Sequence, residues 1–172
     1  MDKRTQKKKI IREVILFLVK FNLLLIPFYG VIIFDINFYP VQEWFANFIG
    51  SVLRVFGYNV EIDWIFIYIE DLPVIDISRD CIGWKSVYSV IALVLASPGL
   101  LKKKLKFLVY WIPGLLLINI VRVVGTILIG LKFGAYYLDI IHKFVWQEIM
   151  IVVIIGVWYL WLRKVIKLNK KK

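Results

Sequence analysis

The chain has 172 residues, of which 61% are hydrophobic, and its mean hydropathy is +0.79. An ordinary soluble domain is only about 45–50% apolar, so this composition excludes a soluble globule, and the aromatic content of 16% excludes a disordered chain. The net charge of +11 does not indicate a nucleic-acid partner, because 16 of the 23 Lys and Arg residues form three clusters that flank apolar segments. The sequence therefore predicts a single integral membrane domain that comprises residues 1–172.

Four apolar segments are long enough to cross the hydrocarbon core of a bilayer, which needs about 20 helical residues. They are residues 14–34, 81–101, 107–130 and 144–162. The first follows a basic arm, as the apolar core of a signal peptide does, but no small-residue cleavage site follows it. We interpret it as a retained helix, so the predicted fold is an all-α membrane bundle of about four transmembrane helices with one extracytoplasmic insertion.

The insertion, residues 35–80, is too long for a linker without structure of its own. After Pro40, large apolar side chains recur at spacings of three and four residues, which predicts an amphipathic helix rich in aromatic residues. The members of this apolar face are Trp44, Phe45, Phe48, Ile49, Val52, Leu53 and Phe56. We expect this helix to lie flat on the outer leaflet of the membrane.

The second half of the insertion has the composition of β-strands. Branched and aromatic residues fill the runs 59–62, 64–69 and 74–77, and these runs are separated by Asp63 and by a turn at residues 70–73. This pattern predicts a small β-hairpin or a three-stranded cap.

The distribution of positive charge predicts the orientation, because Lys and Arg near short loops stay on the cytoplasmic side. Residues 1–13, 102–106 and 163–172 carry six, four and six basic residues, whereas residues 35–80 carry two basic and eight acidic residues. Both termini and the 102–106 loop are therefore expected in the cytoplasm, and the insertion is expected outside the cell membrane.

Three ionisable residues stand out, because such groups are costly inside a membrane and are usually functional there. Cys81 is the only cysteine, His142 is the only histidine, and Arg122 is the only arginine inside a predicted span. The predicted orientation puts Cys81 and His142 at the outer ends of their spans. Arg122 is expected roughly 12 Å below the outer end of its span, a depth that a long side chain partly recovers. All three residues are therefore expected to meet in the outer leaflet.

These residue types suit acyl transfer by a cysteine. A thiolate is the nucleophile, a neighbouring cation lowers the pKa of a thiol, and histidine donates and accepts protons near neutral pH. Lys85 follows Cys81 by four residues, so helical spacing predicts that its charge lowers the pKa of the thiol. Asn119 lies one turn before Arg122, where it either holds the guanidinium, donates to an oxyanion or forms a helix–helix hydrogen bond. The alternative for Arg122 is a purely structural role, with backbone carbonyl groups or Glu148 as partners.

The sequence D-C-I-G-W-K-S around Cys81 opens a predicted span, and its Gly83 permits a close approach of the backbone to a neighbour. The next span contains N-I-V-R, residues 119–122, and a histidine precedes the last span. In this order the three motifs resemble the exosortase and archaeosortase family, particularly its short archaeosortase-like members. The resemblance implies a multi-pass membrane cysteine transpeptidase with Cys81 as the nucleophile, Arg122 as the arginine of the family and His142 as the third catalytic residue.

The resemblance also implies the substrates, which are secreted proteins with a C-terminal sorting signal made of a short motif, one transmembrane helix and a basic cluster. In the predicted reaction, Cys81 attacks a peptide carbonyl near the outer membrane surface and forms a thioester, and His142 protonates the leaving amine. Arg122 and Asn119 stabilise the oxyanion. The acceptor is either water or an amine such as that of a membrane lipid headgroup.

The competing interpretation is a noncatalytic membrane assembly or transport-accessory protein, in which Arg122 and His142 only pair within the bundle. Transport itself is disfavoured, because no carboxylate pair or repeated polar stripe in the sequence indicates an ion pathway. One cysteine and one histidine are too few for a zinc site, which typically needs three or four protein ligands. No metal and no other cofactor is therefore expected.

Overall fold

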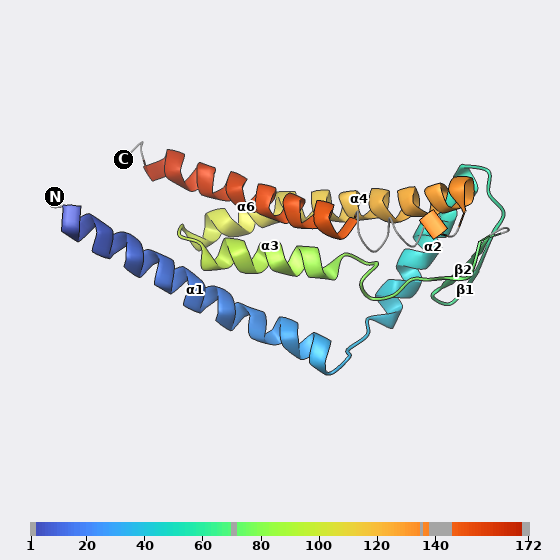
Figure 1. Cartoon of the computed structure of the whole chain (residues 1–172), viewed down its shortest axis with the longest axis horizontal. Helices are drawn as coiled ribbons and strands as arrows, with labels where there is room; N and C mark the ends of the chain where they lie inside the picture. The colour runs from blue at the N-terminus through green and yellow to red at the C-terminus, as the bar shows by residue number, and fades with distance from the viewer. Residues whose placement is uncertain (1–2, 70–71, 135, 138–145, 170–172) are drawn as a thin grey trace.

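The computed structural model describes residues 3–69, 72–134, 136–137 and 146–169. In chain order the elements are α1 (Lys3–Ile33), α2 (Tyr39–Val55), β1 (Val60–Asp63), β2 (Phe66–Ile69), β3 (Ile75–Asp76), α3 (Trp84–Ala96), α4 (Leu101–Phe133) and α6 (Trp146–Asn169). The helices α1, α3, α4 and α6 run along the length of the molecule, α2 and the sheet lie at one end, and both chain ends lie at the other (Figure 1). The prediction of a helical protein with a small inserted sheet is confirmed.

Two of the described helices are long and apolar enough to cross a membrane, Ile10–Ile33 within α1 and the whole of α4. They correspond to the predicted spans 14–34 and 107–130. Helix α6 occupies the place of the predicted span 144–162. Four spans stay a prediction, because neither α6 nor the short apolar helix α3 is among the described helices that are long and apolar enough to cross a membrane.

Helix α3 is shorter than the predicted span 81–101. It has 13 residues, so its length is about 20 Å, whereas the hydrocarbon core of a membrane is about 30 Å thick. It begins only after Gly83, whose φ of +79° lies outside the helical region, and it ends before Ser97, because the following Pro98 disfavours the helical conformation there. Cys81 consequently lies in a turn ahead of the helix.

Helix α2 carries Pro40 in its first turn, where the missing N–H of proline costs no hydrogen bond. Its predicted apolar face is divided in the structure. Phe45 and Ile49 are buried in the core that α2 shares with the sheet and α4, whereas Trp44 is 63% exposed and stacks on Phe48. The helix crosses the direction of the long helices (Figure 1), and its contact with a membrane surface stays a prediction.

The sheet has three antiparallel strands in the order β1-β2-β3, which confirms the predicted cap. Trp64 has a φ of +56° in the tight turn between β1 and β2. Ile67 in the central strand is fully buried in a core formed with α2 and α4. Strand β3 forms one edge of the sheet and leads into the turn that carries Cys81.

Hydrogen bonds from aromatic side chains fix α3 between α1 and α6. The hydroxyl of Tyr88 donates to the carbonyl oxygen of Leu24 in α1 at 2.6 Å. At the other end of α3, Nε1 of Trp158 in α6 donates to the hydroxyl of Ser97 at 2.8 Å. The direction of α3 is thereby set, and with it the position of the turn that precedes the helix.

Candidate active site

Cys81 lies between β3 and α3, and its side chain is buried with only 6% exposed. Its N–H donates to the carbonyl oxygen of Ser78 at 2.9 Å, and its Sγ lies 3.5 Å from the Ser78 hydroxyl. Both contacts close a tight turn around the thiol, so the turn is ordered by its own residues.

Two side chains from distant parts of the sequence hold the segment that precedes Cys81. Gln42 in α2, which is 1% exposed, donates from Nε2 to the carbonyl oxygen of Ile77 at 2.9 Å. Arg79 forms a 2.9 Å ion pair with Asp35, just after the end of α1. The thiol is therefore fixed relative to both α1 and α2.

The amide of Asn119 in α4 binds the turn directly. Its Nδ2 donates to the carbonyl oxygen of Cys81 at 2.7 Å, and its Oδ1 is buried without a partner among the described residues. Gly83 permits this contact, because a Cβ atom there would lie 2.8 Å from Cγ of Asn119. Among the roles expected for Asn119 was a hydrogen bond between two elements. The structure contains such a bond, which joins α4 to the turn of Cys81.

The guanidinium of Arg122 in α4 binds the peptide group that joins Asp80 to Cys81. Its Nη2 donates to the carbonyl oxygen of Asp80 at 3.2 Å, while its Nε is buried and has no partner in the described part of the chain. Glu148, the carboxylate considered as a structural partner, is exposed, and no ion pair joins it to Arg122. One donor of the cation is thus buried without an acceptor among the residues that the structure describes.

Lys85, whose charge was predicted to lower the pKa of the thiol, pairs with a carboxylate in the structure. Its Nζ lies 2.6 Å from the carboxylate of Asp80, which also accepts from Nε1 of Trp84 at 3.3 Å. Helical spacing does not apply between Lys85 and Cys81, because Cys81 precedes the helix. The charge of Lys85 is therefore compensated by a carboxylate at the surface.

Burial raises the pKa of the Cys81 thiol, and this effect outweighs the hydrogen bond with Ser78 and the positive charge of Arg122, which lower the pKa. The carboxylate of Asp76 raises the pKa further. A thiol in this environment is protonated at neutral pH, so nucleophilic attack requires a group that accepts its proton.

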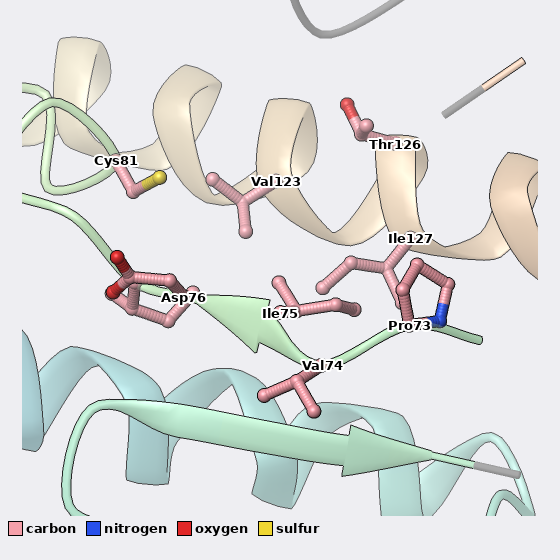
Figure 2. Close-up of a pocket in the computed structure, with 9 residues that line it drawn as sticks. Pro73, Val74, Ile75, Asp76, Cys81, Val123, Thr126 and Ile127 are labelled. Atoms are coloured by element: carbon pink, nitrogen blue, oxygen red, sulfur yellow. The ribbon is translucent and has the colours of Figure 1, made fainter. Parts of the chain in front are cut away.

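A cavity of about 170 Å³ opens beside the thiol. Strand β3 forms one wall and α4 forms the other, with the side chains of Ile75, Val123 and Ile127 between them (Figure 2). Cys81 lies at one end of this cavity and Pro73 lies at the other (Figure 2). A peptide bound in the cavity would lie within reach of the sulfur.

The structure brings together Cys81, Gly83, Asn119 and Arg122, and it pairs Lys85 with the carboxylate of Asp80. His142 lies outside the described residues. In the residues that the structure covers, no group of three or more His, Cys, Asp and Glu side chains could hold a metal ion.

Asp76 and Thr126 line the cavity but did not stand out in the sequence. Asp76 alternates with apolar neighbours, as an ordinary solvent-facing residue of a strand does. Thr126 lies one helical turn after Arg122, and its hydroxyl donates to the Arg122 carbonyl oxygen at 2.8 Å. Its position on the same helical face as Arg122 is the one feature of the sequence that could have indicated its place near the site.

Comparison with known proteins identifies one family. A family model described as transmembrane exosortase matches residues 11–162, which comprise most of the chain and include Cys81, Asn119, Arg122 and His142. No curated protein and no solved structure gives a significant match.

Proposed function

The chain belongs to the transmembrane exosortase family, and on that basis we propose that it cleaves the C-terminal sorting signal of secreted proteins through a thioester on Cys81. Membership of this family indicates a membrane-bound sorting protease or transpeptidase in general. The observation that carries the specific proposal is the position of Arg122, whose guanidinium binds the peptide carbonyl just before Cys81. A nucleophile that lines the cavity thereby has a permanent cation bound to the peptide group before it.

In the proposed first step, Sγ of Cys81 bonds to the carbonyl carbon of the scissile peptide, and the thiol proton passes to His142. The C–N bond then breaks, and the leaving amine takes that proton from His142. The pKa of the thiol is raised by burial, which supports a mechanism in which a base removes the proton during attack. Water or an amine then attacks the thioester and releases Cys81.

Arg122 is the proposed stabiliser of the oxyanion. A guanidinium has several donors in one plane, and Nε of Arg122 is a buried donor without a partner among the described residues. Asn119 is proposed to act first as a positioning residue, because one N–H of its amide binds Cys81. Its second N–H is the proposed further donor to the oxyanion.

The proposed orientation puts the sheet, α2 and Cys81 outside the cell membrane and both termini in the cytoplasm. The arrangement in Figure 1 supports it, because both basic chain ends lie at the end of the molecule opposite to the sheet. Four spans with an extracytoplasmic site follow if α6 and the whole segment 81–101, which contains α3, also cross the membrane. Lipid headgroup amines would then be available to the thioester as acceptors at the outer surface.

The proposal is tested by mapping the C-termini of secreted proteins by mass spectrometry in cells with the wild-type chain and with Cys81→Ala. We expect a set of proteins to retain the C-terminal segment in the Cys81→Ala cells, because the substitution removes one sulfur and little packing. The matched control is Ser51→Ala, on the exposed side of α2, which should give the wild-type C-termini. Normal C-termini in the Cys81→Ala cells would contradict the proposal.

A further inference from the structure

We infer that the free edge of β3 binds the sorting segment of the substrate as an added strand, parallel to β3, with the scissile carbonyl at Cys81. This inference rests on the proposed function and specifies how the site recognises an extended peptide. Addition of a strand to a sheet edge gives affinity through main-chain hydrogen bonds and specificity through pockets for alternate side chains.

The register of the sheet leaves the outer edge of β3 available. The N–H of Ile77 donates to the carbonyl oxygen of Ile65 at 3.0 Å, and Ile75 is paired with Ile67. In an antiparallel ladder the hydrogen-bonding residues alternate, so Ile75 and Ile77 direct their main-chain groups toward β2.

Val74 and Asp76 therefore direct their N–H and C=O groups away from β2. No main-chain hydrogen bond on that side joins either residue to another described residue. Natural proteins normally cover or interrupt such an edge, because it pairs readily with another chain. Here the edge borders a cavity that contains a nucleophile.

The cavity predicts the side chains that the bound segment presents. Its walls are apolar where Ile75, Val123 and Ile127 meet (Figure 2). An apolar cavity of about 150 Å³ holds a molecule of the size of benzene, so this cavity of about 170 Å³ accepts one large or two small apolar side chains. A sorting motif with an apolar residue on the N-terminal side of the cleaved bond fits this space.

The direction of the bound strand follows from the position of Cys81. The thiol lies beyond the C-terminal end of β3, and Pro73 at the other end of the cavity is beside Ile127, toward the end of α4 (Figure 2). In the proposed orientation the substrate enters from outside and continues into its own membrane helix after the motif. It therefore runs from the Pro73 end to the Cys81 end, in the same direction as β3.

Proline substitutions test the main-chain bonds. Proline at position 76 or 74 removes an N–H from the free edge but none from the bonds with β2, and proline is tolerated on edge strands. We expect Asp76→Pro to reduce cleavage of the proteins that accumulate in Cys81→Ala cells at least tenfold relative to Asp76→Ala. Val74→Pro should do the same relative to Val74→Ala, which provides a second comparison if one proline variant fails to fold.

The rate of Cys81 alkylation by iodoacetamide shows whether the site is intact in these variants, and within each pair we expect it to agree within twofold. Equal cleavage by the proline and alanine variants at both positions would overturn the inference. Cleavage that persists with Cys81→Ala would instead overturn the proposed function, so the two failures are distinguishable.

A photo-crosslinking residue, p-benzoylphenylalanine, at position 74 of the Cys81→Ala chain tests the direction in cells. We expect crosslinks to the accumulated proteins on the N-terminal side of their cleavage site. Crosslinks on the C-terminal side would overturn the parallel direction. The absence of crosslinks to proteins that do accumulate would overturn binding at this edge.

Discussion

The side-chain amide of Asn119 donates a 2.7 Å hydrogen bond to the main-chain carbonyl oxygen of Cys81. This bond joins the middle of the long helix α4 to the turn ahead of α3, with Gly83 in contact with the same amide. Both donor and acceptor are buried, so neither has water as an alternative partner. The position of the nucleophile consequently depends on this amide.

We predict that Asn119→Ala reduces cleavage of sorting signals and lowers the free energy of unfolding by about 1–3 kcal/mol, because the Cys81 carbonyl loses its partner. The measurements are C-terminal mapping in cells and thermal unfolding of the purified protein in detergent. Ser97→Ala is the matched control, since it removes a partly buried hydrogen bond with Trp158 at the other end of α3. Equal effects of both substitutions on cleavage would contradict a positioning role for Asn119.

Gly83→Ala should destabilise the protein more than Gly57→Ala. Both glycines have positive φ angles, +79° and +89°, so both substitutions strain the backbone. Only the Cβ at position 83 would meet a neighbour, at 2.8 Å from Asn119 Cγ, whereas position 57 faces open space. In thermal unfolding, the double variant Gly83→Ala/Asn119→Ala should recover part of the loss, because the collision is removed. Additive losses would refute the contact.

Arg122→Lys should abolish cleavage although the positive charge is kept. A compact ammonium group cannot replace the planar donors of a guanidinium, one of which binds the Asp80 carbonyl and others of which bind the oxyanion in the proposed reaction. Arg54→Lys is a suitable control, because Arg54 binds the Val60 carbonyl with Nε and Nη2 and has no hydrogen bond with the turn of Cys81 among the described residues. If Arg122→Lys cleaves at the wild-type rate in the mapping experiment, Arg122 has only a structural role.

The environment of the thiol predicts how alkylation depends on pH. Burial raises the pKa of Cys81, so the thiolate fraction at neutral pH is smaller than for an exposed cysteine, and the alkylation rate increases as the pH rises. The charge of Arg122 lowers that pKa, so Arg122→Gln should shift the profile to higher pH. An exposed cysteine at position 51 in a Cys81→Ala chain provides the reference profile. A shift to lower pH in Arg122→Gln would show that the charge does not act on the thiol.

The elements of the insertion could be predicted because their periodicities are local. The spacing of Trp44, Phe45 and Ile49 indicated α2, and alternation of branched residues indicated the sheet. The division of the apolar face of α2 could not be predicted, because it depends on which residues the sheet and α4 cover.

The depth of Arg122 in the membrane shows why the packing of the sheet against α4 could not be predicted from the sequence. The sequence predicted that Arg122 lies roughly 12 Å below the outer end of its span and that its long side chain reaches up toward Cys81. In the structure α4 continues to Phe133, and the sheet packs along its last turns through Val124 and Ile127. The turn with Cys81 therefore meets α4 at the level of Arg122.

The last prediction concerns orientation, on which access of a secreted substrate to Cys81 depends. Single cysteines are introduced into a Cys81→Ala chain at Glu61 in β1 and at Lys103 at the start of α4, both of which are exposed. In intact cells a membrane-impermeant maleimide should label position 61, and it should label position 103 only after the membrane is opened. The physical reason is the cytoplasmic retention of Lys and Arg, since 16 of the 23 basic residues lie in residues 1–13, 102–106 and 163–172.

Labelling of position 103 in intact cells would place that end of α4 outside. Because α4 spans the distance from Lys103 to the sheet, the sheet and Cys81 would then face the cytoplasm, where no secreted protein could reach the thiol.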